Sequence, residues 1–189
     1  MAFRAFRRVP AAVSRPLAAA AAPRQFHSTP RAFVQVGDAV PDIDLHEASP
    51  ANKVNLAKEY GTGIANGVIV GVPAAFSPSC SASHVPSYIN HPKIGEAGQV
   101  FVVSVNDAFV MKAWGDQLDP TKLSGIRFLA DPTGAFTKAL DLGFEAIPVF
   151  GNMRAKRYAL VIENGKVKSA HVEPDNTGTD VSMADKVLG

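Results

Sequence analysis

Cys80 is the residue of this chain with the clearest capacity for chemistry, because it is the only cysteine among 189 residues. It follows a loop rich in proline and serine, residues 73–79, which comes directly after the apolar run Gly67–Val72. This pattern predicts that a buried strand is followed by a helix that begins near Cys80. At the start of a helix, unpaired backbone N–H groups and the positive end of the helix dipole favour a thiolate. Cys80 is therefore a candidate nucleophile.

A helix start alone does not ionise a cysteine at neutral pH, because an unperturbed thiol has a pKa of about 8.5. A neighbouring arginine would help, since its guanidinium stays protonated. Ser77 can place a hydroxyl beside the sulfur, and Pro73 can shield a thiolate from solvent. Such a group suits attack on the O–O bond of a peroxide, which leaves a sulfenic acid. The arginines beyond the N-terminal segment are Arg127, Arg154 and Arg157.

These arguments also allow a purely structural role for Cys80 and for the residues near it. A single cysteine near a strand end can be a small buried hydrophobe. His84, four residues after Cys80, could tune the thiol or relay a proton, and it could equally cap or pack. One cysteine excludes a disulfide within the chain and a cysteine-rich zinc site. Without a Cys-x-x-Cys pair, a general disulfide oxidoreductase is disfavoured.

Strands and helices are expected to alternate around Cys80. We predict strands at 67–72, 99–105 and 126–130, and helices at 55–60, 80–90, 107–118 and 135–142, with Pro86 interrupting the second helix. Two further strand-like runs, 157–162 and 166–172, flank Asn164-Gly165, which is a strong hairpin signal. This order predicts an α/β domain with a mixed central sheet flanked by helices.

The N-terminal 36 residues have a different composition from the rest. They are rich in arginine and alanine and contain no Asp or Glu, which is typical of a mitochondrial transit peptide. We predict a transit peptide over 1–26, a linker over 27–36, a domain over 37–189 and a location in the mitochondrial matrix. The alternative is a basic tail that carries no targeting signal.

Charge and composition exclude several partner classes. Removal of residues 1–26 leaves 14 basic and 17 acidic side chains, which disfavours nucleic acid as a partner. The apolar runs are too short to span a membrane. Asp38, Asp42, Asp44 and Glu47 lack histidines at metal-ligand spacing, so we interpret them as a solvated acidic surface. No phosphate-binding glycine motif is present, and we expect no cofactor and no metal.

The segment from Val72 to Pro86 resembles the active-site signature of peroxiredoxins, Pro-x-x-x-Thr/Ser-x-x-Cys. The similarity is greatest to the atypical peroxiredoxin 5 type, including its fungal mitochondrial members. It extends over essentially residues 36–184 through further matching segments: 104–110, Trp114-Gly115, 129–136, 150–158 and 172–178.

The resemblance implies a thioredoxin-like fold and a thiol peroxidase that reduces hydrogen peroxide and organic hydroperoxides. Pro73, Ser77 and Cys80 match the family's shielding proline, hydroxyl donor and peroxidatic cysteine. Arg157, and not Arg154, falls at the position of its active-site arginine. The resemblance also implies a homodimer, with the region near Trp114 at or close to the interface, although core packing of Trp114 is as compatible with the sequence.

The chain departs from the two-cysteine members of this type at Val181, which stands at the position of their resolving cysteine. A sulfenic acid on Cys80 must then be resolved by an outside thiol. We expect glutathione with glutaredoxin, or else thioredoxin, as the reductant. A redox sensor that passes oxidation from Cys80 to client thiols is the alternative function. The C-terminal residues 187–189 lack the tripeptide that peroxisomal relatives carry.

Overall fold

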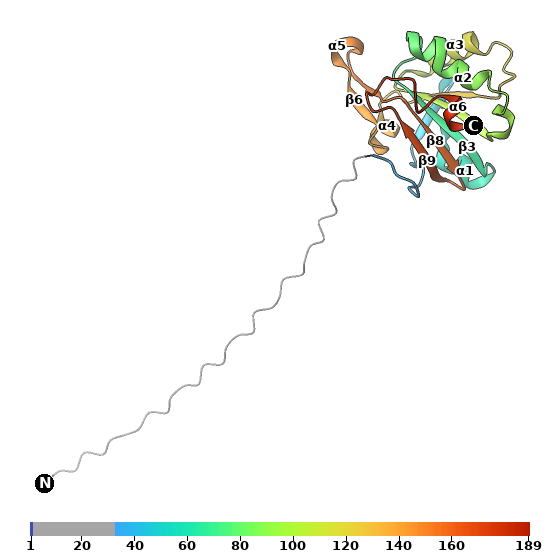
Figure 1. Ribbon diagram of the computed structural model, residues 1–189. Helices are drawn as coiled ribbons and strands as arrows, with labels where there is room; N and C mark the ends of the chain where they lie inside the picture. The colour runs from blue at the N-terminus through green and yellow to red at the C-terminus, as the bar shows by residue number, and fades with distance from the viewer. Residues whose placement is uncertain (2–32) are drawn as a thin grey trace. The chain divides into compact units, whose positions relative to one another are not determined.

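The computed structural model describes Met1 and residues 33–189, so residues 2–32, with nearly all of the predicted transit peptide and the first part of the linker, lie outside the described residues. Within residues 33–189, seven strands form one sheet in the order β2-β1-β5-β4-β3-β8-β9 (Figure 1). Its parallel centre consists of β3 (Asn66–Val72), β4 (Gln99–Ser104) and β5 (Arg127–Ala130). The antiparallel strands are β1 (Asp44–Glu47), β2 (Ser49–Asn55), β8 (Tyr158–Glu163) and β9 (Lys166–Val172). The predicted mixed sheet is confirmed.

Helices pack on both faces of this sheet. Alternate residues of β3 face opposite sides: Ile69 belongs to one apolar cluster, while Val68 and Val70 belong to the other. The first cluster includes side chains of α1 (Leu56–Thr62) and α4 (Ala135–Ala139). The second includes side chains of the π-helical turn η1 (Cys80–His84), α2 (Val85–Ile89), α3 (Ala108–Leu118) and α6 (Ala184–Val187). Cys80 therefore lies in the second layer, with side chains of α2 and α3.

Shorter elements complete the fold. The 3-10 turn η2 covers Ile94–Glu96, and α5 covers Ile147–Phe150. A small second sheet pairs β6 (Gly143–Glu145) with β7 (Met153–Ala155). In the described part of the chain, no helix is long and apolar enough to cross a membrane.

Local sequence signals explain several element boundaries. The Asp107 carboxylate accepts hydrogen bonds from the backbone N–H groups of Phe109 and Val110, as expected at the start of α3. Asn164 and Gly165 have φ angles of 51° and 74°, the conformation that a two-residue hairpin turn requires. The predicted helix over 135–142 is too long, since α4 ends at Ala139 and Asp141 adopts a φ of 54°.

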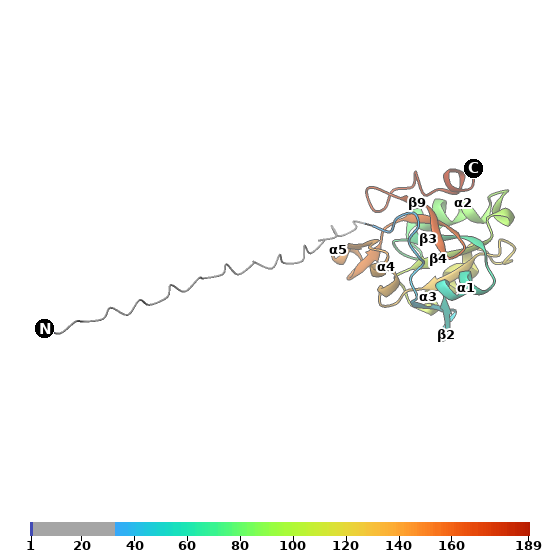
Figure 2. The same cartoon turned by 90° about the horizontal axis from the view of Figure 1, so that it is seen from below.

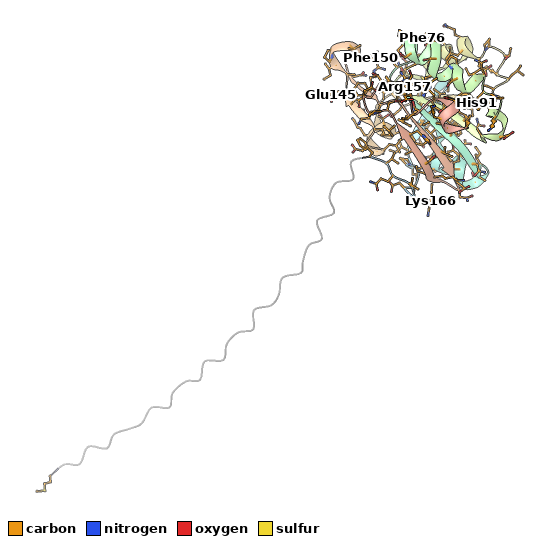
Figure 3. All side chains as sticks on the ribbon, in the orientation of Figure 1. Phe76, His91, Glu145, Phe150, Arg157 and Lys166 are labelled. Carbon is orange, nitrogen blue, oxygen red and sulfur yellow. The ribbon has the colours of Figure 1, made fainter. Side chains whose placement is uncertain are left out.

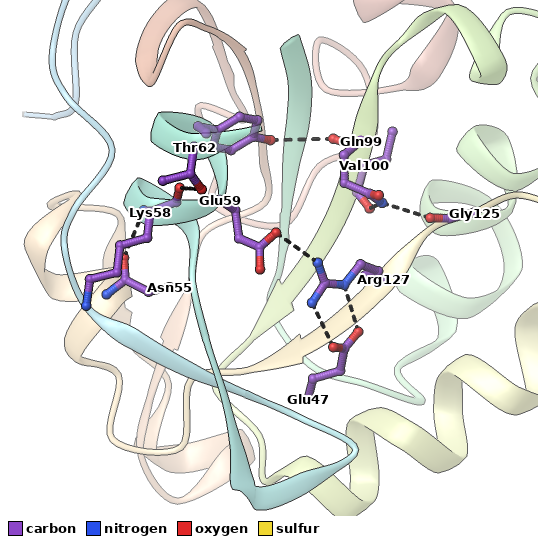
Figure 4. A network of polar contacts seen from close by, with 10 residues as sticks. Glu47, Asn55, Lys58, Glu59, Thr62, Gln99, Val100, Gly125 and Arg127 are labelled. Atoms are coloured by element: carbon purple, nitrogen blue, oxygen red, sulfur yellow. Dashed lines mark hydrogen bonds and ion pairs between the residues drawn. The ribbon is translucent and has the colours of Figure 1, made fainter. Parts of the chain in front are cut away.

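The predicted acidic surface near the domain start is wrong for Glu47. Glu47 lies at the end of β1 and forms two hydrogen bonds with Arg127 of β5, at 2.8 and 2.9 Å (Figure 4). Arg127 also pairs with Glu59 of α1 at 3.3 Å, and its guanidinium lies 5.1 Å from the centre of the Phe101 ring. These contacts connect β1, α1 and the central sheet, so Arg127 has a structural role away from Cys80.

The register of β3 with β8 determines what lies beside the loop that precedes Cys80. β8 runs antiparallel to β3, and Tyr158 pairs with Gly71. The residue before Tyr158 is Arg157, which is thereby placed level with the end of β3. The sheet thus brings together two segments that are separated by 77 positions in the sequence.

Candidate active site

Cys80 and Arg157 are in direct contact in the interior of the domain. Nη1 of Arg157 donates a hydrogen bond to Sγ of Cys80 at 3.3 Å. The thiol is fully buried and the arginine is 2% exposed. Figure 3 labels Arg157 within the domain. The guanidinium thus places a positive charge and a hydrogen-bond donor directly against the sulfur.

The guanidinium is oriented by the chain that follows β9. Nε of Arg157 donates to the carbonyl oxygen of Thr177 at 3.1 Å. The backbone N–H of Arg157 donates to the carbonyl of Asn176 at 2.7 Å, and its own carbonyl accepts from the N–H of Glu173 at 3.0 Å. Both the backbone and the side chain of Arg157 are therefore fixed by residues 173–177.

The loop between β3 and η1 places Pro73 and Ser77 shortly before Cys80 in the chain. Pro73 is buried and directly follows β3, while Ser77 is half-buried. The Ser77 hydroxyl donates to the carbonyl of Ala74 at 2.9 Å, which leaves its oxygen lone pairs available as acceptors. The carbonyl of Ser77 accepts from the N–H of Ser81 at 3.0 Å and so joins the loop to the turn that carries Cys80.

The conformation of this loop is supported from the neighbouring strand. Oδ1 of Asn106, just past β4, accepts hydrogen bonds from the N–H of Ala75 and from the hydroxyl of Ser104. Phe76 has a φ of 61°, which is unusual for a residue other than glycine. Such backbone strain is found where the surroundings hold a functional loop in one conformation.

The predicted helix over 80–90 is divided in two. Its first part, Cys80–His84, is π-helical, and α2 continues it over Val85–Ile89. The change lies between His84 and Val85, and Pro86, which has no N–H to donate, falls in the first turn of α2. A π-helical turn is uncommon and is often found at functional sites.

His84 is buried on the same layer and contacts the C-terminal part of the chain. Its Nε2 lies 3.0 Å from the carbonyl oxygen of Ser182. Burial, together with the charge of Arg157, lowers the pKa of His84 to about 4. The imidazole is therefore neutral at physiological pH, with Nε2 as the donor to that carbonyl. Packing is what the structure shows for His84, and its use in proton relay stays a prediction.

Arg154, the remaining candidate arginine, has other contacts. Its Nη1 donates to the carbonyl of Val105 at 2.6 Å, and its guanidinium lies 4.8 Å from the centre of the Phe150 ring. Burial lowers its pKa. Of the three arginines, Arg157 is the one for which the structure shows a contact with Cys80.

Trp114 packs within the chain beside the π-helical turn. It is fully buried, and its Nε1 donates to the hydroxyl of Ser81 at 3.0 Å. The centre of its ring lies 5.7 Å from the centre of the Phe128 ring, which it meets edge-on, and 6.5 Å from the centre of the Phe76 ring. The core-packing interpretation of Trp114 therefore describes its side chain, while Phe76 beside it is 49% exposed.

The chemistry available at this site comes from the groups near Cys80. Across residues 33–189, no group of three or more His, Cys, Asp or Glu side chains is arranged to hold a metal ion. The group that contacts the sulfur is the guanidinium of Arg157, and the hydroxyl of Ser77 lies three residues before Cys80 in the chain. This combination suits a nucleophilic sulfur that attacks a small polar substrate.

Sequence reasoning did not assign roles to the residues that hold Arg157 in place. Glu173, Asn176 and Thr177 belong to a segment that resembled the family, but their contacts are made through backbone groups at long range. The local signal that could have indicated a turn here is Pro174-Asp175 followed by Gly178.

Comparison with known proteins identifies the family. The family model described as Redoxin matches residues 35–188. This chain belongs to the redoxin family and is a peroxiredoxin of the peroxiredoxin 5 type. The predicted membership of the peroxiredoxins, the predicted thioredoxin-like fold and the predicted thiol peroxidase class are thereby confirmed.

Individual relatives agree with this peroxiredoxin assignment. The chain is 45% identical over 159 residues to peroxisomal membrane associated protein 20 of Schizosaccharomyces pombe, which covers 82% of this chain and 98% of that protein. It is 37% identical to peroxiredoxin-2C of Oryza sativa, with 82% and 96% covered. Among solved structures, peroxiredoxin 5 from Alvinella pompejana superposes with a TM-score of 0.67 at 36% identity, over 76% of this chain and 92% of that one.

Proposed function

We propose that this peroxiredoxin works by a one-cysteine mechanism in which Cys80 is the peroxidatic residue and an external thiol completes the cycle. The observation that carries the proposal is the 3.3 Å contact between Arg157 and the sulfur of the chain's single cysteine. Peroxidase activity through a cysteine belongs to the family.

In the first step, the Cys80 thiolate attacks one oxygen of the hydroperoxide. An S–O bond forms, the O–O bond breaks, and the departing oxygen takes a proton to leave as water or an alcohol. Cys80 is oxidised to the sulfenic acid and the peroxide is reduced. Arg157 stabilises the thiolate and the negative charge that develops on oxygen. Ser77 positions the peroxide through its hydroxyl, and Pro73 limits access of water.

In the second step, an outside thiol attacks the sulfenic sulfur and water leaves, which gives a mixed disulfide. A second thiol releases Cys80 and forms the external disulfide. Glutathione with glutaredoxin is our first choice of reductant, because a small thiol can reach a recessed sulfur. Thioredoxin is the second choice. No residue of the 189 can replace these thiols, since the sequence contains no second cysteine.

The decisive experiment is a single-turnover reaction of the reduced protein with hydrogen peroxide, followed by stopped flow. Wild type should react far faster than Cys80→Ser, and mass spectrometry should find one added oxygen on Cys80. Each reductant is then offered in turn, and glutathione with glutaredoxin should restore the thiol. Equal rates for the two proteins would refute the role of Cys80. Restoration by client proteins alone, seen as trapped mixed disulfides in cells, would favour the sensor function instead.

We also propose that the mature protein is a homodimer in the mitochondrial matrix. The arginine-rich, acid-free composition of residues 1–36 supports the location. Exposed Phe76 and Phe109, at 49% and 65%, support an association surface near the active-site loop. Import into isolated mitochondria followed by N-terminal sequencing tests the first proposal, with cleavage expected after Phe26. Sedimentation of the mature protein tests the second, and a monomer at all concentrations would contradict it.

A further inference from the structure

One segment of the chain contacts both Arg157 and the helical layer that begins at Cys80. We call residues 173–184 the C-terminal clasp. At one end, the carbonyls of Asn176 and Thr177 accept hydrogen bonds from Arg157. Toward the other end, the clasp contacts the helical layer that begins at Cys80, and Figure 2 shows the end of the chain running beside α2.

The contact with the helical layer is made by the backbone of the clasp. The carbonyl of Ser182 accepts from the Tyr88 hydroxyl at 2.6 Å and from Nε2 of His84 at 3.0 Å. The N–H of Ala184 donates to the Ser87 hydroxyl at 3.2 Å. These partners lie within two turns of Cys80, so the clasp fixes the position of the helix that carries the thiol.

The buried carboxylate of Glu173 links the first residue of the clasp to residues near its other end. Glu173 is 2% exposed. Its Oε1 accepts from the N–H of Asp180 at 2.8 Å, from the N–H of Ser182 at 2.9 Å and from the Ser182 hydroxyl at 2.7 Å. Burial opposes ionisation of Glu173, but the hydrogen bonds from Ser182 and Asp180 outweigh it and hold its pKa below the ordinary value. Oε1 therefore draws together positions 173, 180 and 182.

The same residue is attached to Arg157. The N–H of Glu173 donates to the carbonyl of Arg157 at 3.0 Å, while the carbonyl of Asn176 accepts from the N–H of Arg157 at 2.7 Å. Loss of the carboxylate would remove its bonds to Asp180 and Ser182, so that residues 174–181 would be fixed at their Arg157 end alone. The carbonyl of Thr177 would then be held less firmly against Nε of the guanidinium.

We propose that Glu173 is a positioning residue for the peroxidase reaction. Its carboxylate closes the clasp and so holds the Arg157 guanidinium and the Cys80 helix in the relative position that the reaction needs. This inference rests on the proposed roles of Cys80 and Arg157. It adds a residue that touches neither the sulfur nor the peroxide.

The test compares Glu173→Ala with Glu173→Gln in single-turnover reactions with hydrogen peroxide, without any reductant. Glutamine keeps an oxygen that can accept from the backbone of residues 180 and 182, whereas alanine does not. Glu163→Ala is the matched control, because Glu163 is exposed at the hairpin and pairs with Lys168. Trp114 supplies a fluorescence signal, since its Nε1 contacts the residue after Cys80.

We expect Glu173→Ala to lower the second-order rate constant by roughly 10-fold or more and to move the pH profile of the reaction by about half a unit to higher pH. Glu173→Gln should stay within about 3-fold of wild type, and Glu163→Ala should equal wild type. A purely structural role would lower the melting temperature of Glu173→Ala and leave the rate and pH profile of the folded protein unchanged. That result would overturn the proposal.

A second variant keeps the test decisive if Glu173→Ala does not fold. Ser182→Ala removes one of the three donors and retains the backbone carbonyl that binds Tyr88 and His84. It should slow the reaction by about 3-fold with the same direction of pH shift. A wild-type rate and pH profile for this variant would overturn the proposal. Failure of the proposed function is distinguished separately, because wild type itself would then react no faster than Cys80→Ser.

Discussion

The guanidinium of Arg157 is distinguished from that of Arg127 by what it contacts. Arg127 is paired with Glu47 and Glu59, so its charge is compensated within the fold. Arg157 donates instead to a backbone carbonyl through Nε and to the Cys80 sulfur through Nη1. The planar guanidinium makes both contacts at once. The role that we propose for Arg157 in the peroxide reaction therefore depends on the geometry of its guanidinium as well as on its charge.

A lysine at position 157 should test this requirement. An ammonium on a flexible stem cannot reproduce the Nε and Nη1 contacts together, so Arg157→Lys should slow the single-turnover reaction with peroxide by about 100-fold. Arg127→Lys is the matched control and should react at the wild-type rate, with a loss of stability only. Stopped-flow fluorescence measures both, and equal rates for the two variants would contradict the role of Arg157.

The buried, neutral His84 should make stability depend on pH. The pKa of His84 is about 4 in the folded protein, whereas an exposed histidine has a pKa of about 6.5. Between these values the unfolded chain binds the proton and the folded protein does not, so stability falls as pH falls. The loss begins near the unfolded value and continues to the folded one.

The expected size of this effect is about 2 kcal/mol of unfolding free energy between pH 7 and pH 5. Urea denaturation at the two pH values measures it. In His84→Gln the same pH change should cost about 2 kcal/mol less than in wild type, because the titrating group is absent. An undiminished pH dependence in this variant would show that other groups cause it.

At the scale of elements, the close pairing of β3 with β8 positions Arg157. A Cβ atom at Gly71 would lie 2.0 Å from Cε1 of Tyr158, and Tyr158 is fully buried. The buried ring would have to shift to make room for such an atom. Glycine at position 71 is therefore needed for β8 to begin where it does, one residue after Arg157.

Gly71→Ala should accordingly destabilise the domain by about 2 kcal/mol or more, through overpacking against Tyr158. It should also slow the peroxide reaction, since the start of β8 must shift. Gly61→Ala in α1 is the control: its Cβ would meet no atom within 4 Å, and alanine is the better helix former. Chemical denaturation compares them. Similar stabilities for the two variants would show that β8 adapts without cost.

The elements predicted from local signals were mostly confirmed. The elements that depend on distant partners were not predicted. The strand before the Cys80 loop, the Asp107 cap and the Asn164-Gly165 hairpin each follow from neighbouring residues. β1 and β2 were missed because their sequence is polar and β1 is stabilised by pairing with β5. Likewise, Cys80 could be selected from its loop, whereas Glu173 acts through contacts that no local pattern encodes.

At the scale of the whole molecule, the absence of a second thiol determines how the enzyme must be reduced. Val181 is 37% exposed in the clasp, at the position where two-cysteine relatives carry a thiol by resemblance. Its neighbour Ser182 contacts His84 on the Cys80 helix, so position 181 lies close to that helix. A thiol placed there is expected to reach Cys80 when the π-helical turn opens.

Val181→Cys should therefore convert the protein to a two-cysteine enzyme. After one equivalent of peroxide, mass spectrometry should find a Cys80–residue 181 disulfide in place of the sulfenic acid, since an intramolecular thiol outcompetes external ones. Excess peroxide without reductant should drive wild type to the sulfinic acid, and the variant should resist this by roughly 10-fold in peroxide concentration. Val149→Cys on exposed α5 is the control for an added thiol outside the clasp. Sulfinic acid formation in Val181→Cys at the wild-type peroxide concentration would show that the clasp cannot bring position 181 to the sulfur.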